Sequence, residues 1–302
     1  MERFIEKNND LKFNTTELAK KFLSYLKMNC ELPNSFSFIN YDLLFSVYEE
    51  VDKSLLKSFL NKFSESDYKN INVVITGNIG VGKSTAAEIF KILLNQELNN
   101  DKLKELPIEQ RINVVSYPEY IRIPDVGEMM LELRNSNKIT VETFQHFILD
   151  CWDLLFSGKD FNLKPVNKRI NIFERLPEDS IKCFAKNSYK QNEISKEGFE
   201  RLNNRYNDLI KTYNVFEAKD CKIIELHNEQ TIGNLINRIL KLLIENLDNG
   251  ITNNMFVLMV SEETYCKRIQ IRGRNAEATL NREVLSMFNN YYTEILKEIS
   301  QN

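Results

Sequence analysis

The sequence predicts an α/β fold in which a parallel sheet of five strands is flanked by helices on both faces. A glycine-rich loop at residues 77–85 joins an apolar, β-branched run to an amphipathic run, as a phosphate-binding loop requires. Further short apolar runs recur along the chain, separated by stretches with helical periodicity. The composition, with only nine glycines and six prolines in 302 residues, favours a helix-rich globular protein.

The first strand is expected over residues 71–76, and the loop after it matches the pattern G-x-x-x-x-G-K-[ST]. Backbone N–H groups of such a loop converge on phosphate oxygens, and the helix expected over 85–94 adds its dipole. We expect Lys83 to neutralise charge on the β- and γ-phosphates and Ser84 to ligate Mg²⁺. A chance glycine turn is the alternative. The residues predicted to surround the nucleotide phosphates are Gly77, Asn78, Ile79, Gly80, Val81, Gly82, Lys83, Ser84 and Thr85.

Composition excludes several other classes of protein. The formal net charge is −3, so no global positive field recruits nucleic acid or an anionic membrane. Five scattered cysteines without C-x-x-C spacing argue against a disulfide framework or a zinc site. No apolar run approaches the roughly 18 residues of a membrane span, and the first residues lack a signal-peptide core. We therefore expect a cytoplasmic protein in a reducing compartment, without a membrane partner.

The stretch before the first strand has helical periodicity and nearly balanced charge, which leaves no electrostatic footprint for DNA. Residues 64–70 are polar and interrupt the apolar period. We therefore predict a boundary at residue 70. Residues 1–70 would form a helical N-terminal extension of unknown role, and residues 71–302 would form the phosphate-loop domain.

Two further strands, expected over 111–117 and 169–175, end in polar residues. In open α/β sheets the carboxyl ends of the strands face the ligand crevice. Glu119, after the first of these strands, could accept a proton from a substrate hydroxyl. Arg175, which ends the second beside Glu174, could hold a transferring phosphoryl group. A surface or helix-start glutamate and a simple salt-bridge arginine remain the alternatives.

A long helical pattern covers residues 125–156, and Gln145 lies within it on a mostly apolar face. A glutamine offers one acceptor and one donor group to the edge of a base, although most such glutamines are surface residues. The last two strands are expected over 221–226 and 255–260, with a helix over 231–247 between them.

Three arginines, Arg268, Arg272 and Arg274, cluster near the start of a helix after the last strand. Guanidinium groups offer forks that match phosphate oxygens, although such a cluster can also be a solvated basic face. A terminal amphipathic helix is expected over residues 282–299.

In this order along the chain, the phosphate loop, Pro118-Glu119, Phe144-Gln145, Glu174-Arg175 and the segment 268–277 resemble the deoxynucleoside kinase family, of the thymidine, deoxyadenosine and deoxyguanosine kinase type. The resemblance covers roughly residues 71–299 and marks the chain as a divergent member. It implies a P-loop kinase architecture, with ATP and Mg²⁺ as cofactors. It also implies phosphorylation of the 5′-hydroxyl of a deoxynucleoside in nucleotide salvage, and we expect a homodimer.

The resemblance also implies roles for single residues. Glu119 is similar to the base that activates the 5′-hydroxyl, Gln145 to the glutamine that pairs with the nucleobase, and Arg175 to the arginine beside the 5′-oxygen. A lid is expected near residues 268–280, in which Glu277 contacts the sugar 3′-hydroxyl. The catalytic residues are then Glu119, Lys83, Arg175, Arg272 and Arg274; Arg268 and Arg272 join the ATP site; and Glu119, Gln145, Arg175 and Glu277 bind the nucleoside.

The chain differs from the family pattern in the order of its last elements. The family's last strand and helix follow the lid, whereas here residues 222–247 precede it. The sheet still needs an edge strand, so we predict that residues 221–226 lie parallel and adjacent to 255–260, joined through the intervening helix. The tyrosine that helps to hold the 3′-hydroxyl also has no match in residues 131–135. The aromatic residue that the family usually has after the catalytic glutamate has no match in residues 120–124, so a different base pocket is expected.

Two other functions stay open from the sequence. One is a nucleoside monophosphate kinase of the thymidylate type, which needs additional basic groups for the acceptor phosphate. The other is a catalytically weak nucleotide-binding regulator, in which residues 1–70 are the effector and the phosphate loop is a switch.

Overall fold

The computed structural model describes residues 41–99, 111–122, 126–157, 168–227, 231–273, 277 and 282–300. Within them, five parallel strands form one sheet in the order β2-β3-β1-β5-β4. The strands are β1 (Asn70–Gly77), β2 (Ile112–Tyr117), β3 (Lys168–Glu174), β4 (Lys222–His227) and β5 (Asn253–Met259). The α/β fold with a parallel five-stranded sheet is therefore confirmed.

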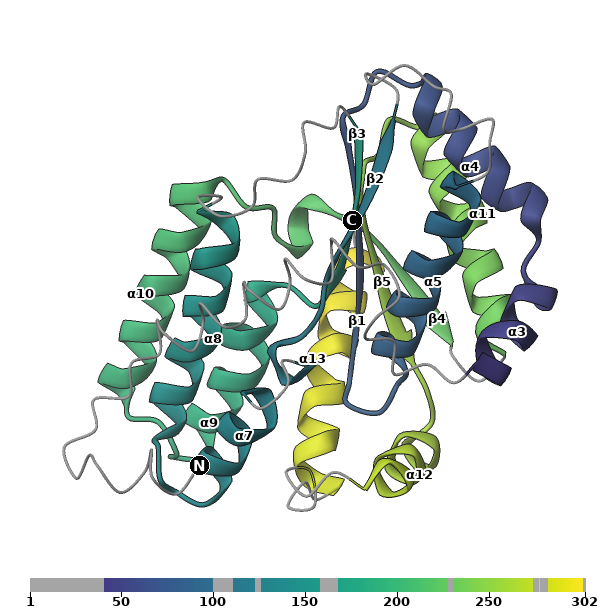
Figure 1. Cartoon of the computed structure of the whole chain (residues 1–302). Coiled ribbons are helices and arrows are strands. Elements are labelled where there is room, and N and C mark those ends of the chain that lie inside the picture. The colour runs from purple at the N-terminus through teal and green to yellow at the C-terminus, as the bar shows by residue number, and fades with distance from the viewer. Residues whose placement is uncertain are drawn as a thin grey trace.

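The central strand β1 is buried on both faces, which explains its run of apolar, β-branched residues. Alternate side chains enter different clusters: Val73 and Ile75 pack into one, and Val74 packs into another. Helices cover both faces (Figure 1). On one side lie α4 (Lys53–Glu65), α5 (Lys83–Leu98) and α11 (Ile232–Asp248), and on the other lie α13 (Arg282–Ser300) and α8 (Val141–Phe156).

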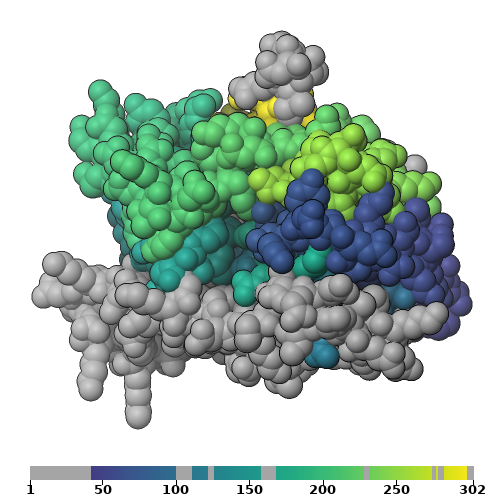
Figure 2. All heavy atoms as spheres, turned by 90° about the horizontal axis from the view of Figure 1, so that it is seen from above, coloured from purple at the N-terminus to yellow at the C-terminus, as the bar shows by residue number. Residues whose placement is uncertain are grey.

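The helices before β1 pack into the same core as the sheet. Phe59, Leu60 and Phe63 of α4 are fully buried in the cluster that also holds β1, α5 and α11. The preceding helix α3 (Tyr41–Glu50) is joined to α11 through Asn237, which donates to the carbonyl of Glu50 at 3.0 Å. Figure 2 shows this part of the chain lying against the residues of α11. Residues 41–65 therefore share a core with the sheet, and the division of the chain at residue 70 stays a prediction.

The prediction for the edge strand is confirmed. β4 pairs in parallel with β5, in a register that sets Ile223 opposite Met255. The connecting helix α11 buries Leu235, Ile236, Ile239, Leu240 and Leu243 against the sheet. An apolar helical face of this length needs a surface to cover, and the β4–β5 pair provides it.

The helical stretch expected over 125–156 is two helices, α7 (Gly127–Asn135) and α8. The break has a local cause, because Asn137 adopts a positive φ of 55° and Lys138 N–H bonds back to the carbonyl of Leu133 at 2.9 Å. Thr140 then caps α8 by accepting a hydrogen bond from the backbone N–H of Thr143 at 3.0 Å. Such a reversal is easily hidden in a continuous apolar period.

The remaining helices lie mainly around the carboxyl edge of the sheet and the α8 side (Figure 1). They are the short η2 (Tyr120–Arg122), the π-helical η3 (Asp179–Ala185), α9 (Lys186–Lys190), α10 (Lys196–Tyr213), η4 (Ala218–Asp220) and α12 (Glu262–Arg272). No helix in the described ranges is both long and apolar enough to span a bilayer.

Candidate active site

The loop between β1 and α5 passes close to the backbone of two other elements. Gly77 has φ +135°, and a Cβ there would lie 2.4 Å from the carbonyl oxygen of Leu258 in β5. Gly80 has φ +82°, and its Cβ would lie 2.8 Å from the carbonyl oxygen of Tyr265 in α12. Only glycine fits either position, so these two residues fix the path of the loop.

Lys83 begins α5 and is only 5% exposed. Its Nζ donates to the carbonyl oxygen of Asn78 at 2.8 Å, inside the curve of the loop. Burial lowers the pKa of Lys83 to about 8, helped by the positive charges of Arg175 and Arg272, while Glu119 and Glu174 oppose the shift. A lysine whose charged form is disfavoured by burial suits an anionic ligand, because the charge of that ligand would return the pKa of the lysine to its ordinary value.

Oxygen ligands for Mg²⁺ lie beside this lysine. Ser84 Oγ donates to Glu174 Oε2 at 2.7 Å, which brings a hydroxyl and a carboxylate together at the end of β3. Mg²⁺ prefers oxygen and usually takes one or two protein groups, with water and substrate phosphates completing its shell. Ser84 and Glu174 therefore fit the ion, and Glu174 is a candidate ligand that the sequence did not single out.

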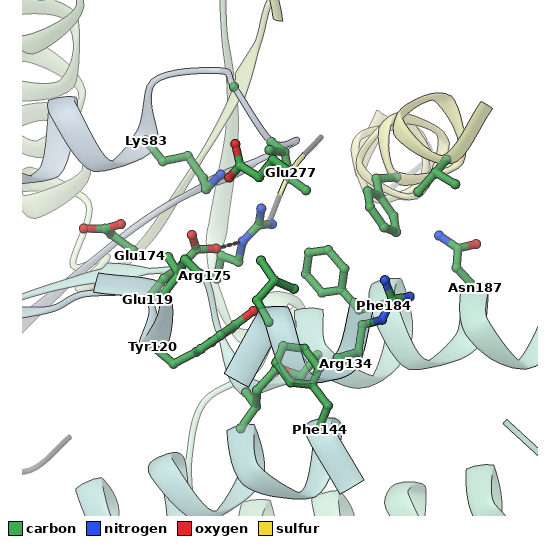
Figure 3. Close-up of a pocket in the computed structure, with 18 of the residues that line it drawn as sticks. Lys83, Glu119, Tyr120, Arg134, Phe144, Glu174, Arg175, Phe184, Asn187 and Glu277 are labelled. Carbon is green, nitrogen blue, oxygen red and sulfur yellow. Dashed lines mark hydrogen bonds and ion pairs between the residues drawn. The ribbon is translucent and has the colours of Figure 1, made fainter. Parts of the chain in front are cut away.

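The strand ends bring Glu119 and Arg175 together as an ion pair. Arg175 Nε donates to Glu119 Oε1, as the dashed line in Figure 3 shows. Arg175 is only 6% exposed and its backbone has φ 75°, which is uncommon for a residue with a side chain. Its guanidinium carbon lies 4.9 Å from the ring centroid of Phe184. Arg175 thus forms the salt bridge that the sequence left as an alternative, and its partner is another of the predicted catalytic residues.

The end of the site away from the phosphate loop is aromatic (Figure 3). Tyr120 meets Phe144 edge to face at 5.3 Å between centroids, and it meets Phe147 in the same way at 5.9 Å. Gln145, on α8, is 3% exposed, and its Oε1 is buried without a hydrogen-bond partner among the described residues. A buried carbonyl oxygen of this kind is costly unless a ligand donates to it.

The segment after β5 reaches over the phosphate loop. Arg268, in α12, donates through Nη1 to the carbonyl oxygen of Val81 at 3.2 Å. Arg272 donates to Glu277, which is 7% exposed. The arginines lie in the second half of α12, not near a helix start as expected, because Ser261 caps the helix and Gly273 ends it with φ 61°. Arg274 lies outside the described residues.

These groups line one cavity of about 880 Å³, a volume within the usual range for small-ligand sites. Among the predicted residues, the cavity is lined by Ile79, Gly80, Gly82, Lys83, Ser84, Thr85, Glu119, Gln145, Arg175, Arg268, Arg272 and Glu277. The side chain of Asn78 instead donates to the carbonyl oxygen of Leu285 in α13 at 2.8 Å. Gly77 and Val81 also lie outside the lining.

Sequence reasoning missed several lining residues. The sequence was expected to lack an aromatic residue for this pocket in residues 120–124, but Tyr120, directly after Glu119, lines the cavity and meets Phe144. Arg134, on α7, lines the far end of the cavity and donates to Glu193 at 3.2 Å and to Asn135 at 3.0 Å. Nothing local in the sequence distinguishes Arg134 from a surface arginine, because its place depends on the break after α7.

One family of known proteins matches the chain. The family model described as deoxynucleoside kinase matches residues 73–238, which is more than half of the chain. A comparison with curated protein sequences found no match. Among solved structures, the chain is similar to "Structure of deoxyadenosine kinase from M.mycoides with bound dATP", with 19% identity and a TM-score of 0.44 over 76% of this chain and 86% of that chain. From the extent of the family match, the chain belongs to the deoxynucleoside kinase family.

Proposed function

We propose that the protein transfers the γ-phosphoryl group of ATP to the 5′-hydroxyl of a deoxynucleoside. The observation that carries this proposal is the arrangement of a single cavity. Lys83 lies at one end, the Glu119–Arg175 pair lies beside it, and the rings of Tyr120 and Phe144 lie at the other end (Figure 3). Ser84, next to Lys83, and Gln145, next to Phe144 in α8, line the same cavity. A nucleoside whose base met Gln145 would present its sugar to the ion pair.

In this proposal Glu119 accepts the proton of the 5′-hydroxyl as its oxygen attacks the γ-phosphorus. The bond from that phosphorus to the oxygen bridging it to the β-phosphate breaks, and the products are a nucleoside monophosphate and ADP. Arg175 holds the Glu119 carboxylate through Nε and lines the same cavity. One guanidinium therefore orients the general base, Glu119, and also faces the transferred phosphoryl group.

The phosphate end supplies charge that is already in place before the reaction. Lys83 donates to the β- and γ-phosphate oxygens, and Arg272 and Arg268 approach from the lid side. Ser84 and Glu174 would hold Mg²⁺, which neutralises phosphate charge when it is bound. We expect phosphate to compete with Glu277 for Arg272, which frees the Glu277 carboxylate for the sugar 3′-hydroxyl.

The test is turnover with ATP and Mg²⁺ on a panel of deoxynucleosides and their monophosphates. Deoxynucleosides should be phosphorylated, and Lys83→Ala should abolish turnover, because it removes the charge that the phosphate loop itself directs at the β- and γ-phosphates. Lys57→Ala is the matched control, since that side chain is 59% exposed and should leave turnover unchanged. Faster turnover of monophosphates would support a monophosphate kinase, and nucleotide binding without turnover would support a regulator. Near-normal activity of Lys83→Ala would exclude the mechanism.

Three expectations from the sequence stay predictions beside this proposal. A homodimer predicts a particle of twice the chain mass in sedimentation. A cytoplasmic location predicts that the protein is recovered in the soluble fraction of the cells that make it. A role in nucleotide salvage predicts that the growth of these cells depends on an external deoxynucleoside. The lid role of residues 268–280 predicts that nucleotide binding protects this segment from proteolysis.

A further inference from the structure

A buried hydrogen-bond network holds the guanidinium of Arg175 from a helix late in the chain. Arg175 Nη1 donates to the hydroxyl of Tyr292, in α13. That hydroxyl donates in turn to Asp179 Oδ1 at 3.0 Å. Tyr292 is fully buried and Asp179 is 3% exposed, and neither lines the cavity. The network contacts the active site through Arg175, and Asp179 Oδ1 also accepts from Thr76 Oγ1 at 3.5 Å, in β1 directly before the phosphate loop.

The charges of the network depend on one another. Burial opposes the charge on Arg175, but Glu119, Tyr292 and Asp179 outweigh it, so the pKa of the guanidinium is raised. Burial raises the pKa of Asp179, and Arg175 acts against that rise. The Tyr292 hydroxyl lies between them, accepting from the cation and donating to the carboxylate. A phenyl ring would fill the same volume but satisfy neither group.

Two of the guanidinium nitrogens are occupied by protein. Arginine has five N–H donors in a planar fork. Nε is bonded to Glu119 and Nη1 to Tyr292, which fixes the plane of the fork at two points. In the portion of the chain that the structure describes, Nη2 has no hydrogen-bond partner. An arginine held in this way keeps its third nitrogen for a phosphoryl oxygen and loses little side-chain entropy when it binds.

The backbone around Arg175 is fixed by the same carboxylate. Asp179 Oδ2 accepts from the backbone N–H of Leu176 at 2.8 Å, and Asp179 N–H bonds to the carbonyl of Leu176 at 3.1 Å. This closes the turn in which Arg175 adopts its positive φ. The π-helical segment η3 begins at Asp179, and π-helical turns are frequent at functional sites.

Helix α13 also joins the phosphate loop. The carbonyl oxygen of Leu285 accepts from Asn78 Nδ2 at 2.8 Å, and Tyr292 follows two turns later on the same buried face. The helix begins at Arg282, five residues after Glu277 of the lid segment. Helix α13 thus contacts both the phosphate loop and Arg175, and it comes directly after the lid segment in the sequence.

From this geometry we propose that Tyr292 and Asp179 are positioning residues for phosphoryl transfer, which act by holding Arg175 and so make α13 part of the catalytic machinery. The inference rests on the proposed function, because it assigns Arg175 a task in that reaction. It predicts a loss in kcat that is separate from any loss in substrate binding. A purely structural role would lower thermal stability without this separation.

The first test compares Tyr292→Phe with Tyr291→Phe, its neighbour in α13, which is half-buried and has no hydrogen bond from its hydroxyl in the described residues. Tyr292→Phe should lower kcat roughly 10- to 100-fold, as expected for a lost hydrogen bond to a charged group. KM for ATP and for the nucleoside should change less than about twofold. Tyr291→Phe should keep kcat. An unchanged kcat in Tyr292→Phe would overturn the inference.

The second test is a double-mutant cycle with Arg175→Ala. If Tyr292 acts through Arg175, Tyr292→Phe should cause no further loss of kcat in the Arg175→Ala background. Independent, multiplicative losses would overturn the inference. Asp179→Asn keeps an oxygen for the Tyr292 hydroxyl but removes the charge and the second oxygen, which accepts from Leu176 N–H. It should therefore lower kcat in the same direction if Tyr292→Phe proves too unstable to assay. An inactive wild type would instead refute the proposed function, which separates the two failures.

Discussion

Lys83 offers a direct test of the electrostatics of the site, because its pKa should change when nucleotide binds. Burial, together with the positive charges of Arg175 and Arg272, lowers the pKa of Lys83 to about 8 in the ligand-free chain. Phosphate oxygens beside Nζ would stabilise the charged form and return the pKa toward its ordinary value of about 10.4. Binding of ATP above pH 7 should therefore be accompanied by proton uptake.

The size of the uptake follows from the fraction of Lys83 that is neutral before binding. A group with a pKa of about 8 is about one-tenth neutral at pH 7, about half neutral at pH 8 and about nine-tenths neutral at pH 9. The protein should then take up about 0.1, 0.5 and 0.9 protons per ATP at these three pH values.

Titration calorimetry in two buffers of different ionisation enthalpy measures this number directly. Lys83→Arg is the matched control, because an arginine keeps its charge throughout this range and should show no pH-dependent uptake. Equal uptake at pH 7 and pH 9 in the wild type would refute the reasoning. Equal uptake in the wild type and the variant would assign the proton to another group.

The same pKa shift has a consequence for folding. The folded-state pKa of Lys83 is below its unfolded value, so the unfolded chain binds more protons between about pH 8 and pH 10.5. The burial penalty is full below pH 8, at about 3 kcal/mol, and disappears as the pH rises through that window. The gain in free energy of unfolding from Lys83→Met should therefore be largest at pH 7 and small near pH 10.

Three other substitutions test the remaining assignments. Glu119→Gln keeps the shape of the side chain but removes the proton acceptor, so kcat should fall by roughly 10²-fold or more with nucleoside affinity largely kept; an unchanged kcat would make Glu119 structural. Gln145→Ala leaves a base edge unpaired, so nucleoside binding should weaken by about 1–3 kcal/mol while ATP binding stays constant, and equal losses for both ligands would indicate misfolding. Phe59→Ala should destabilise the chain by about 3–5 kcal/mol in one unfolding transition, whereas Phe45→Ala, 65% exposed, should change little; a separate early transition would support an independent extension.

Local patterns predicted most of the fold. The phosphate loop, the five strands and helix α11 each have a signal within about 20 residues, either a periodicity or a motif. The break between α7 and α8 was not predicted, because the apolar periodicity continues across it and the chain reverses at Asn137 within only a few residues. The packing of α4 into the core of the sheet was also not predicted, because the apolar face of a helix does not indicate which surface it covers.

The positions of the candidate site residues were predictable where these residues follow strand ends, and not where they depend on packing between distant parts of the chain. Glu119 and Arg175 could be placed together because both follow parallel strands. Tyr292 lies 117 residues from Arg175, and nothing near it in the sequence separates it from Tyr291. Only the packing of α13 on the sheet distinguishes these two neighbouring tyrosines.

The strand order shows which neighbours the phosphate loop requires. The phosphate loop contacts β5 and α12 at three points, through Gly77 and Leu258, Gly80 and Tyr265, and the bond from Arg268 to Val81. These contacts require that the strand beside β1 lead directly into α12, and β5 does so. The edge strand β4 meets only β5 within the described sheet, so its position in the sequence is less constrained. A chain whose edge strand precedes β5 in the sequence can therefore build the same phosphate loop environment, because α11 connects the two strands and packs into the core beneath them.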